Sequence, residues 1–384
     1  MFGSRREFCP HLVWFILKAD LYGSWIFGLF PFTFDSRRKQ LRCSRWLRLY
    51  GLIANYSFMC LIFYMGRENM KLHKLDAFER NPLLERINMI IGLLSVFSAT
   101  VMHFMNFWGS KRVEEIANEL IALEYHSDGL NLKDCPKFNC FVIQKSMTMM
   151  GQFLSFLTVN YGMPGNNYAM YLVILSGLMQ ISLNLNIMHC YFGILLIYRY
   201  AWMMNEQLLG LVRQLKLDPT SDSSRTRNFL SLYTRLLELN KKLVAAYEYQ
   251  ITLILTGGLA GNIVIIYFLI VFGVSMKKKS IFLIVFPQTL FINIWDFWLT
   301  IAVCDLTERA GKKTATILKL FTDLELKDAE LEKSLKEFAW LCSHRKFRFQ
   351  LCGLFSVNYK MGFQMIITSY LYLLYLVQFD YMNL

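Results

Sequence analysis

Four ionisable side chains interrupt the long apolar stretches of this sequence: His103, Lys145, His189 and Asp296. An ionisable group at membrane depth is costly, so each is a candidate for function. Two interpretations of Asp296 are open: a carboxylate inside a helix bundle, paired with Lys145 or a histidine, or part of a transport or proton-relay path. We favour pairing, because nothing resembles a chain of carboxylates through the membrane. The two histidines are interpreted as interior side chains with hydrogen-bond partners.

Uncharged polar side chains gather in the opposite halves of the same stretches, among several phenylalanines. A mostly apolar cavity with a few hydrogen-bonding groups suits a small uncharged ligand. Ordinary hydrogen bonding between helices is the alternative for any single residue. As a set they predict a ligand pocket open to the outside, formed by Asn88, Ser95, Gln152, Thr158, Tyr161, Tyr171, Asn262, Tyr267 and Gln288.

The sequence contains no motif for catalysis, cofactor binding, metal binding or nucleic-acid binding. There is no catalytic motif and no phosphate-cradling glycine loop, so we expect no enzyme and no cofactor. The Cys342-Ser-His344 triplet lacks partners at zinc-ligand spacing, so we expect no metal site. No long basic cluster with interleaved aromatics indicates nucleic acid.

The elements that position these residues follow from composition. Of 384 residues, 55% are apolar and only 18% are charged, whereas a soluble domain is roughly a quarter charged. The apolar residues form runs of about 20, the length that a helix needs to cross a bilayer. The sequence thus predicts an all-α polytopic membrane protein with seven spans: Trp46–Met65, Ile87–Trp108, Cys140–Tyr161, Tyr168–Tyr198, Gln250–Phe272, Ile281–Cys304 and Lys360–Phe379. His11–Phe34 is interrupted by Lys18 and Asp20 and predicts an interfacial or re-entrant helix.

Basic residues between the spans set the orientation. Segments on the side of the N-terminus hold 30 Lys and Arg, and those on the other side hold 8. We therefore predict a cytosolic N-terminus and an external C-terminus in a multi-pass plasma-membrane protein. The excess of +13 lies between the spans, where it can face anionic lipid headgroups.

Apolar residues recur at helical spacing from Ile317 to Phe349, beyond the sixth span. Such a stripe needs an apolar partner. One candidate partner is the chain's own Arg199–Tyr249 segment, and the other is another subunit. The two interpretations are weighted equally and are compatible.

The seventh span has one face that is more polar than the others. Thr368, Leu371, Tyr375 and Gln378 follow the spacing of three and four that aligns side chains on a helix. A single helix cannot enclose water, so this stripe predicts contact with other helices or a pore built from several copies.

The same span resembles the insect gustatory receptors, whose C-terminal signature is Thr-Tyr, five apolar residues and Gln-Phe. The chain matches it at Tyr372, Leu373–Val377, Gln378 and Phe379, with Leu371 in place of the threonine. Size, seven spans and the basic middle loop extend the likeness over the whole chain. The terminus Tyr-Leu-Leu-Tyr-Leu-Val-Gln-Phe-Asp-Tyr-Met-Asn-Leu is most similar to the fruit-fly gustatory receptor 22 subfamily.

That resemblance implies a ligand-gated cation channel of four like subunits or of subunits with co-receptors, in the dendrites of taste neurons. It divides the chain into a cytosolic N-terminal segment (1–45), six spans with the tastant pocket (46–304), cytosolic anchor helices (305–353) and the pore helix with the external C-terminus (354–384). Gln378 and Phe379 would form the constriction, with Tyr375 and Leu371 below. A ring of Asp380 carboxylates would concentrate cations; alternatively, Asp380 only marks the water boundary. The likened subfamily is associated with bitter, aversive compounds.

Two other classes compete with this prediction. A seven-helix G-protein-coupled receptor needs the opposite orientation and an Asp-Arg-Tyr-like triplet and Asn-Pro-x-x-Tyr, which this sequence lacks. A secondary transporter is motivated by Asp296, Lys145 and the histidines, but we find no inverted repeat or paired broken helices.

Overall fold

The structure is a computed structural model that describes residues 4–72, 82–127, 135–162, 170–217, 223–273, 282–321, 328–353 and 355–382. Helices dominate these residues, which confirms the predicted helical class. They are α1 (Ser4–Ile26), α2 (Arg45–Leu72), α4 (Pro82–Trp108), α5 (Ser110–Ser127), α6 (Pro136–Gly162), α7 (Met170–Leu217), α8 (Ser223–Gly273), α9 (Phe282–Lys319), α10 (Ala329–His344) and α11 (Tyr359–Met382).

The apolar runs coincide with helices. The seven runs fall in α2, α4, α6, α7, α8, α9 and α11, in that order, with at most two residues of a run outside its helix. The helices are longer than the runs, and α7, α8 and α9 extend well beyond theirs at one end. Within the described residues, four helical segments are long and apolar enough to cross a membrane: Val173–Lys216, Arg225–Tyr267, Pro287–Lys319 and Tyr359–Gln378.

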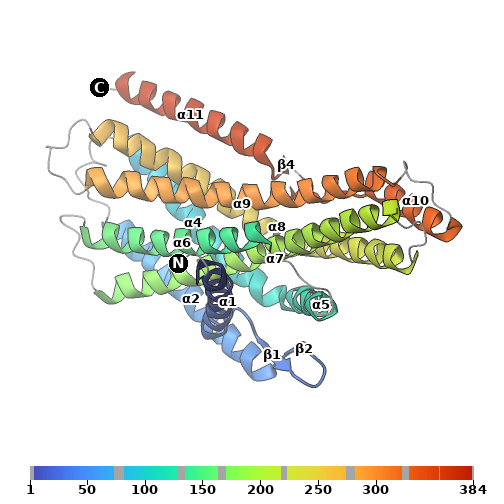
Figure 1. The fold of residues 1–384 in the computed structure, drawn as a ribbon. Coiled ribbons are helices and arrows are strands. Elements are labelled where there is room, and N and C mark those ends of the chain that lie inside the picture. Colours follow the sequence, from blue (N-terminus) through green and yellow to red (C-terminus); the bar gives the residue numbers. More distant parts are fainter. Residues whose placement is uncertain are drawn as a thin grey trace.

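Long helices form the body of the molecule. α6, α7, α8 and α9 run side by side along its length, and α11 lies along one side (Figure 1). α7 is central: 72% of its most apolar 18-residue stretch is buried, against 17% of the corresponding stretch of α11. α1 lies across α6 and α7 instead of alongside them (Figure 1), which fits a helix interrupted by charges.

Two short antiparallel hairpins are features that the sequence patterns did not predict. β1 (Phe32–Asp35) pairs with β2 (Gln40–Cys43), and β3 (Gln350–Leu351) pairs with β4 (Phe355–Ser356). The second hairpin turns at Cys352 and Gly353, which both have positive φ, and leads directly into α11. The Asn358 side chain then caps α11 by accepting a hydrogen bond from the backbone N–H of Met361 at 3.0 Å.

A close approach of backbones links α1 to α2. Gly28, at φ +65°, lies after α1, and a Cβ built on it would come 2.6 Å from the Cα of Gly51 in α2. Because no Cβ fits there, both positions require glycine.

The stripe from Ile317 to Phe349 packs within the chain. Leu331, Leu335, Phe338 and Cys342 of α10 are buried in the cluster that also contains Leu208 and Leu236. The interpretation of packing against the Arg199–Tyr249 segment is thus confirmed. These side chains face their own chain, so a subunit contact here needs other residues. Leu324, part of the predicted stripe, lies outside the described residues.

Candidate functional site

A cavity of about 170 Å³ lies where α6, α7, α8 and α9 meet. Aliphatic side chains from α7 and α8 form much of its wall. Its polar lining comes from α6, α8 and α9. The lining comprises Ile187, Cys190, Tyr191, Ile194, Ile251, Ile254, Leu255, Gly258 and Phe297, with Gln152, Asn262, Asn293, Asp296 and Thr300.

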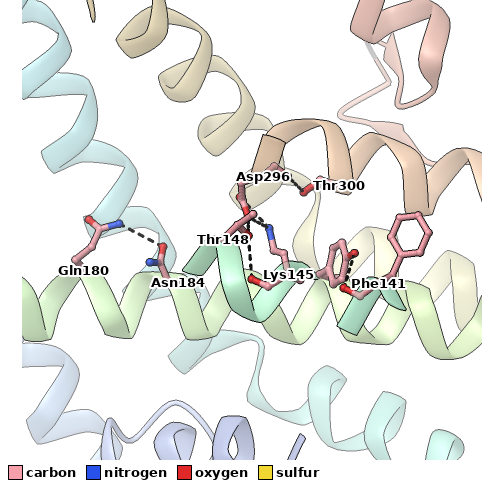
Figure 2. Close-up of polar contacts among 8 residues, drawn as sticks. Phe141, Lys145, Thr148, Gln180, Asn184, Asp296 and Thr300 are labelled. Carbon is pink, nitrogen blue, oxygen red and sulfur yellow. Dashed lines mark hydrogen bonds and ion pairs between the residues drawn. The ribbon is translucent and has the colours of Figure 1, made fainter. Parts of the chain in front are cut away.

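A buried ion pair lies at the wall of this cavity. The Lys145 Nζ of α6 donates to both carboxylate oxygens of Asp296 in α9, at 2.8 and 2.9 Å. The hydroxyl of Thr148 also donates to Asp296 Oδ1, at 2.6 Å, and Figure 2 shows the three side chains converging between the two helices. The prediction that Asp296 pairs inside the bundle is confirmed.

The pairing decides the charge of the cavity wall. The Lys145 side chain is only 3% exposed, and its ammonium also lies 5.0 Å from the ring centroid of Tyr191. Asp296 is 18% exposed and lines the cavity. Because Lys145 and Thr148 bind both oxygens, Asp296 presents a neutralised carboxylate, and the cavity has no net charge from this pair.

The two span histidines have separate partners. His103 Nδ1 lies 2.8 Å from Asn55 Oδ1, and its ring stacks on Phe58. His189 Nε2 lies 2.6 Å from the hydroxyl of Ser24 in α1. Their interpretation as interior histidines with hydrogen-bond partners is confirmed, although His103 Nε2 has no partner within the described residues.

The nine predicted pocket residues separate into groups. Gln152 and Asn262 meet at the cavity. Tyr267 is 2% exposed and packs against Leu373 of α11, whereas Tyr171 and Gln288 are exposed outside the cavity. The remaining four lie on α4 and α6, but their side chains are outside the described part of the structure: Asn88, Ser95, Thr158 and Tyr161.

Several cavity residues were missing from the predicted set. Asn293 and Thr300 lie three positions before and four positions after Asp296, so helical spacing puts all three on one face of α9. That spacing was the signal available in the sequence. The apolar lining carries no such signal, because apolar residues of several types occur on more than one face of these helices.

The predicted pore residues lie on a face of α11 that its own chain leaves uncovered. Leu371 and Tyr375 are 60% and 63% exposed, and Gln378 is exposed as well. Leu373, two residues from Leu371 and thus nearly opposite on the helix, is buried against α8. Phe379 and Asp380 continue α11, but their side chains lie outside the described part.

The sequence profile of a family described as 7tm chemosensory receptor matches residues 17–383 of the chain. Among curated proteins of Drosophila melanogaster, gustatory receptor 22b is 63% identical over 387 residues, covering 100% of both chains. The gustatory receptor for bitter taste 22e is 41% identical over 372 residues, covering 96% of both.

Solved structures with a similar fold include the insect olfactory receptor OR5 of Machilis hrabei. Its TM-score is 0.66 at 12% identity, covering 96% of this chain and 99% of that one. OR5 in complex with eugenol gives a TM-score of 0.68 at 10% identity, with the same coverage. At these identities the likeness shows a shared fold.

Proposed function

On the premise that this chain belongs to the chemosensory receptor family, and within it to the gustatory receptors, we propose that it is a subunit of a ligand-gated cation channel in the plasma membrane of taste neurons. The resemblance read from the C-terminal motif is confirmed by these matches. The channel activity, the cell and the ligand are parts of the proposal. A relative at 41% identity is named as a receptor for bitter taste, and we extend that quality to this chain.

The proposed topology has seven spans, with the N-terminus in the cytosol and the C-terminus outside. It is supported by the helices that contain the seven apolar runs and by the distribution of Lys and Arg, 30 against 8. It puts the α10 end of the long helices in the cytosol.

The proposed ligand pocket is the cavity between α6 and α9, and it favours a compact, uncharged tastant. The observation that carries this is the Asp296 carboxylate, already paired with Lys145, beside the amides of Gln152 and Asn262. A charged ligand would have to compete with this ion pair inside a mostly apolar cavity, which disfavours its binding. The volume suits about one aromatic ring, since a cavity of roughly 150 Å³ holds benzene.

The proposed pore is lined by α11 from each of four copies. Its support is the uncovered face with Leu371, Tyr375 and Gln378, because a helix that packs on one face and leaves a partly polar face open needs neighbours from other chains. Tyr267, five residues after Asn262 on α8, contacts α11 and offers a mechanical link between pocket and pore.

The pocket is tested by calcium imaging of cells that express the receptor, using a panel of small neutral phenols, plant alkaloids and sugars. For any agonist found, Gln152→Ala and Asn262→Ala should each shift the half-maximal concentration about tenfold, since roughly 1.4 kcal/mol corresponds to tenfold. Gln288→Ala is the matched control, because Gln288 is exposed outside the cavity. Equal shifts in all three variants would remove the cavity from the proposal.

The channel is tested by single-channel recording of the purified receptor in bilayers. Unitary openings evoked by the agonist are expected from a channel, whereas a transporter gives none. Surface staining of a C-terminal tag on unpermeabilised cells tests the orientation. An internal C-terminus would contradict the topology and reopen the G-protein-coupled alternative.

A further inference from the structure

The β1–β2 hairpin and the first turn of α2 bear a concentrated positive charge. Six basic side chains lie between Phe32 and Arg48, and Asp35 is the one carboxylate in that range. All six are exposed: Arg37, Arg38, Lys39, Arg42, Arg45 and Arg48. In the described part of the chain, their one recorded ion pair joins Arg42 to Asp35 at 3.8 Å. Most of this charge is therefore not neutralised by the protein.

The hairpin that presents these charges is held in place. Asn118 of α5 accepts from the backbone N–H of Leu41 at 2.6 Å and donates to the Leu41 carbonyl at 3.1 Å. Inside the turn, Asp35 Oδ1 accepts from the backbone N–H groups of Arg37 and Arg38. Phe32, the first residue of β1, is fully buried. The backbone is thus ordered before any ligand arrives, which lowers the entropic cost of binding.

Exposed aromatic side chains follow the hairpin at the start of α2. Trp46 is 82% exposed, and Tyr50 one turn later is 46% exposed. Tryptophan and tyrosine concentrate at membrane–water interfaces, where their rings lie at headgroup level. These two side chains favour a position of the basic hairpin at the depth of lipid phosphates.

We propose that this basic hairpin is a binding site for anionic, phosphate-bearing lipid headgroups of the cytosolic leaflet. Guanidinium groups form paired hydrogen bonds to phosphate, and five of the six cations are arginine. The orientation rule counts only basic residues near a span, whereas this site depends on the hairpin and the first turn of α2, which together present the six cations. The inference uses the proposed cytosolic orientation but is independent of ligand identity and of channel activity.

The test uses the purified full-length receptor and native mass spectrometry, with phosphatidylinositol bisphosphate, phosphatidylserine and phosphatidylcholine titrated in turn. Anionic lipids should bind at least about tenfold more tightly than phosphatidylcholine. In the triple variant Arg37→Gln, Arg38→Gln, Lys39→Gln, that preference should fall by about tenfold or more, since each basic residue near the surface contributes roughly fivefold.

The matched control removes three exposed lysines on and after α10, in Lys333→Gln, Lys336→Gln, Lys346→Gln, and should keep the preference. Equal losses in both triple variants would overturn the proposal, because net charge alone would then explain binding. Strong competition by soluble inositol phosphate would also overturn it, since the site would then recognise a free phosphate.

A second measurement covers the case in which the triple variant fails to fold. In the unaltered receptor, a photoactivatable anionic lipid should crosslink within residues 32–48, and a zwitterionic analogue should not. Crosslinks that map only to other segments would refute the assignment. Because no tastant is needed, these results stand apart from any failure of the channel proposal.

Discussion

Breaking the pair between Lys145 and Asp296 should be far more harmful than removing both charges. At the 2.8 Å separation of Lys145 Nζ and Asp296 Oδ1, Coulomb attraction is about 6 kcal/mol at an effective dielectric constant of 20. Desolvation of the two ions offsets much of this gain, so the intact pair contributes little net stability. A single replacement leaves one buried charge unpaired, at a cost of about 3–5 kcal/mol.

The two single replacements should differ in a definite order. Asp296→Leu leaves the ammonium of Lys145, which is only 3% exposed, without a counter-ion. Lys145→Met leaves Asp296, which still faces the cavity and hydrogen-bonds with Thr148. We therefore expect Asp296→Leu to destabilise the protein more, and the double variant Lys145→Met, Asp296→Leu to recover most of the loss.

The assay is the apparent melting temperature of purified receptor in detergent, followed by fluorescence-detected size exclusion. Lys336→Met is the control, because its pair with Glu332 is solvent-exposed and such pairs contribute about 1 kcal/mol or less. If the double variant melts at the temperature given by adding the two single losses, the side chains are not coupled and the reasoning fails.

Four further predictions follow from other contacts. Leu331→Glu with Leu335→Glu should abolish the monodisperse folded peak, not merely dissociate subunits, because both side chains are buried within the chain; a stable monomer would contradict this. Gly51→Val should lower the melting temperature, because Gly28 leaves no space for a Cβ, and Gly257→Val, with open space around it, is the control. Burial raises the pKa of Cys342 to about 12, so roughly one thiol in ten thousand is ionised at pH 8. In a receptor whose only remaining cysteine is Cys342, maleimide should therefore label the folded protein far more slowly than the protein in denaturant. Asp380→Asn should reduce inward cation conductance in dilute salt and much less in high salt, since the Debye length falls from about 30 Å at 0.01 M to about 8 Å at 0.15 M; normal conductance of Asp380→Lys in dilute salt would remove the carboxylate ring.

The sequence alone predicted the helical elements, because the pattern that indicates a membrane span lies in consecutive residues. A run of about twenty apolar residues is typical of a membrane span, so each run indicated a helix. Both predicted ends of α11 lie within three residues of the helix, whereas α2 and α4 each extend further at one end. The sequence also predicted that Asp296 is paired, with Lys145 or a histidine as the candidates, and the structure shows Lys145. A lone charge at membrane depth is so costly that the few ionisable groups in the spans must find one another. The C-terminal motif, read in the same way, indicated the family that the comparisons confirm.

Tertiary structure decided which polar residues share a site. Gln152 and Asn262 meet at one cavity, while Gln288, of the same chemical type, is exposed outside it. The direction in which a side chain points depends on the rotation of its helix about the helix axis. In helices that are apolar on all sides, no periodic pattern specifies that rotation. The β1–β2 hairpin shows the same limit: the six cations of the hairpin and the first turn of α2 are visible in the sequence, but the contact that holds the hairpin on α5 joins Leu41 to Asn118, 77 residues away. Such contacts between distant residues arise only when the helices pack, and no local pattern encodes them.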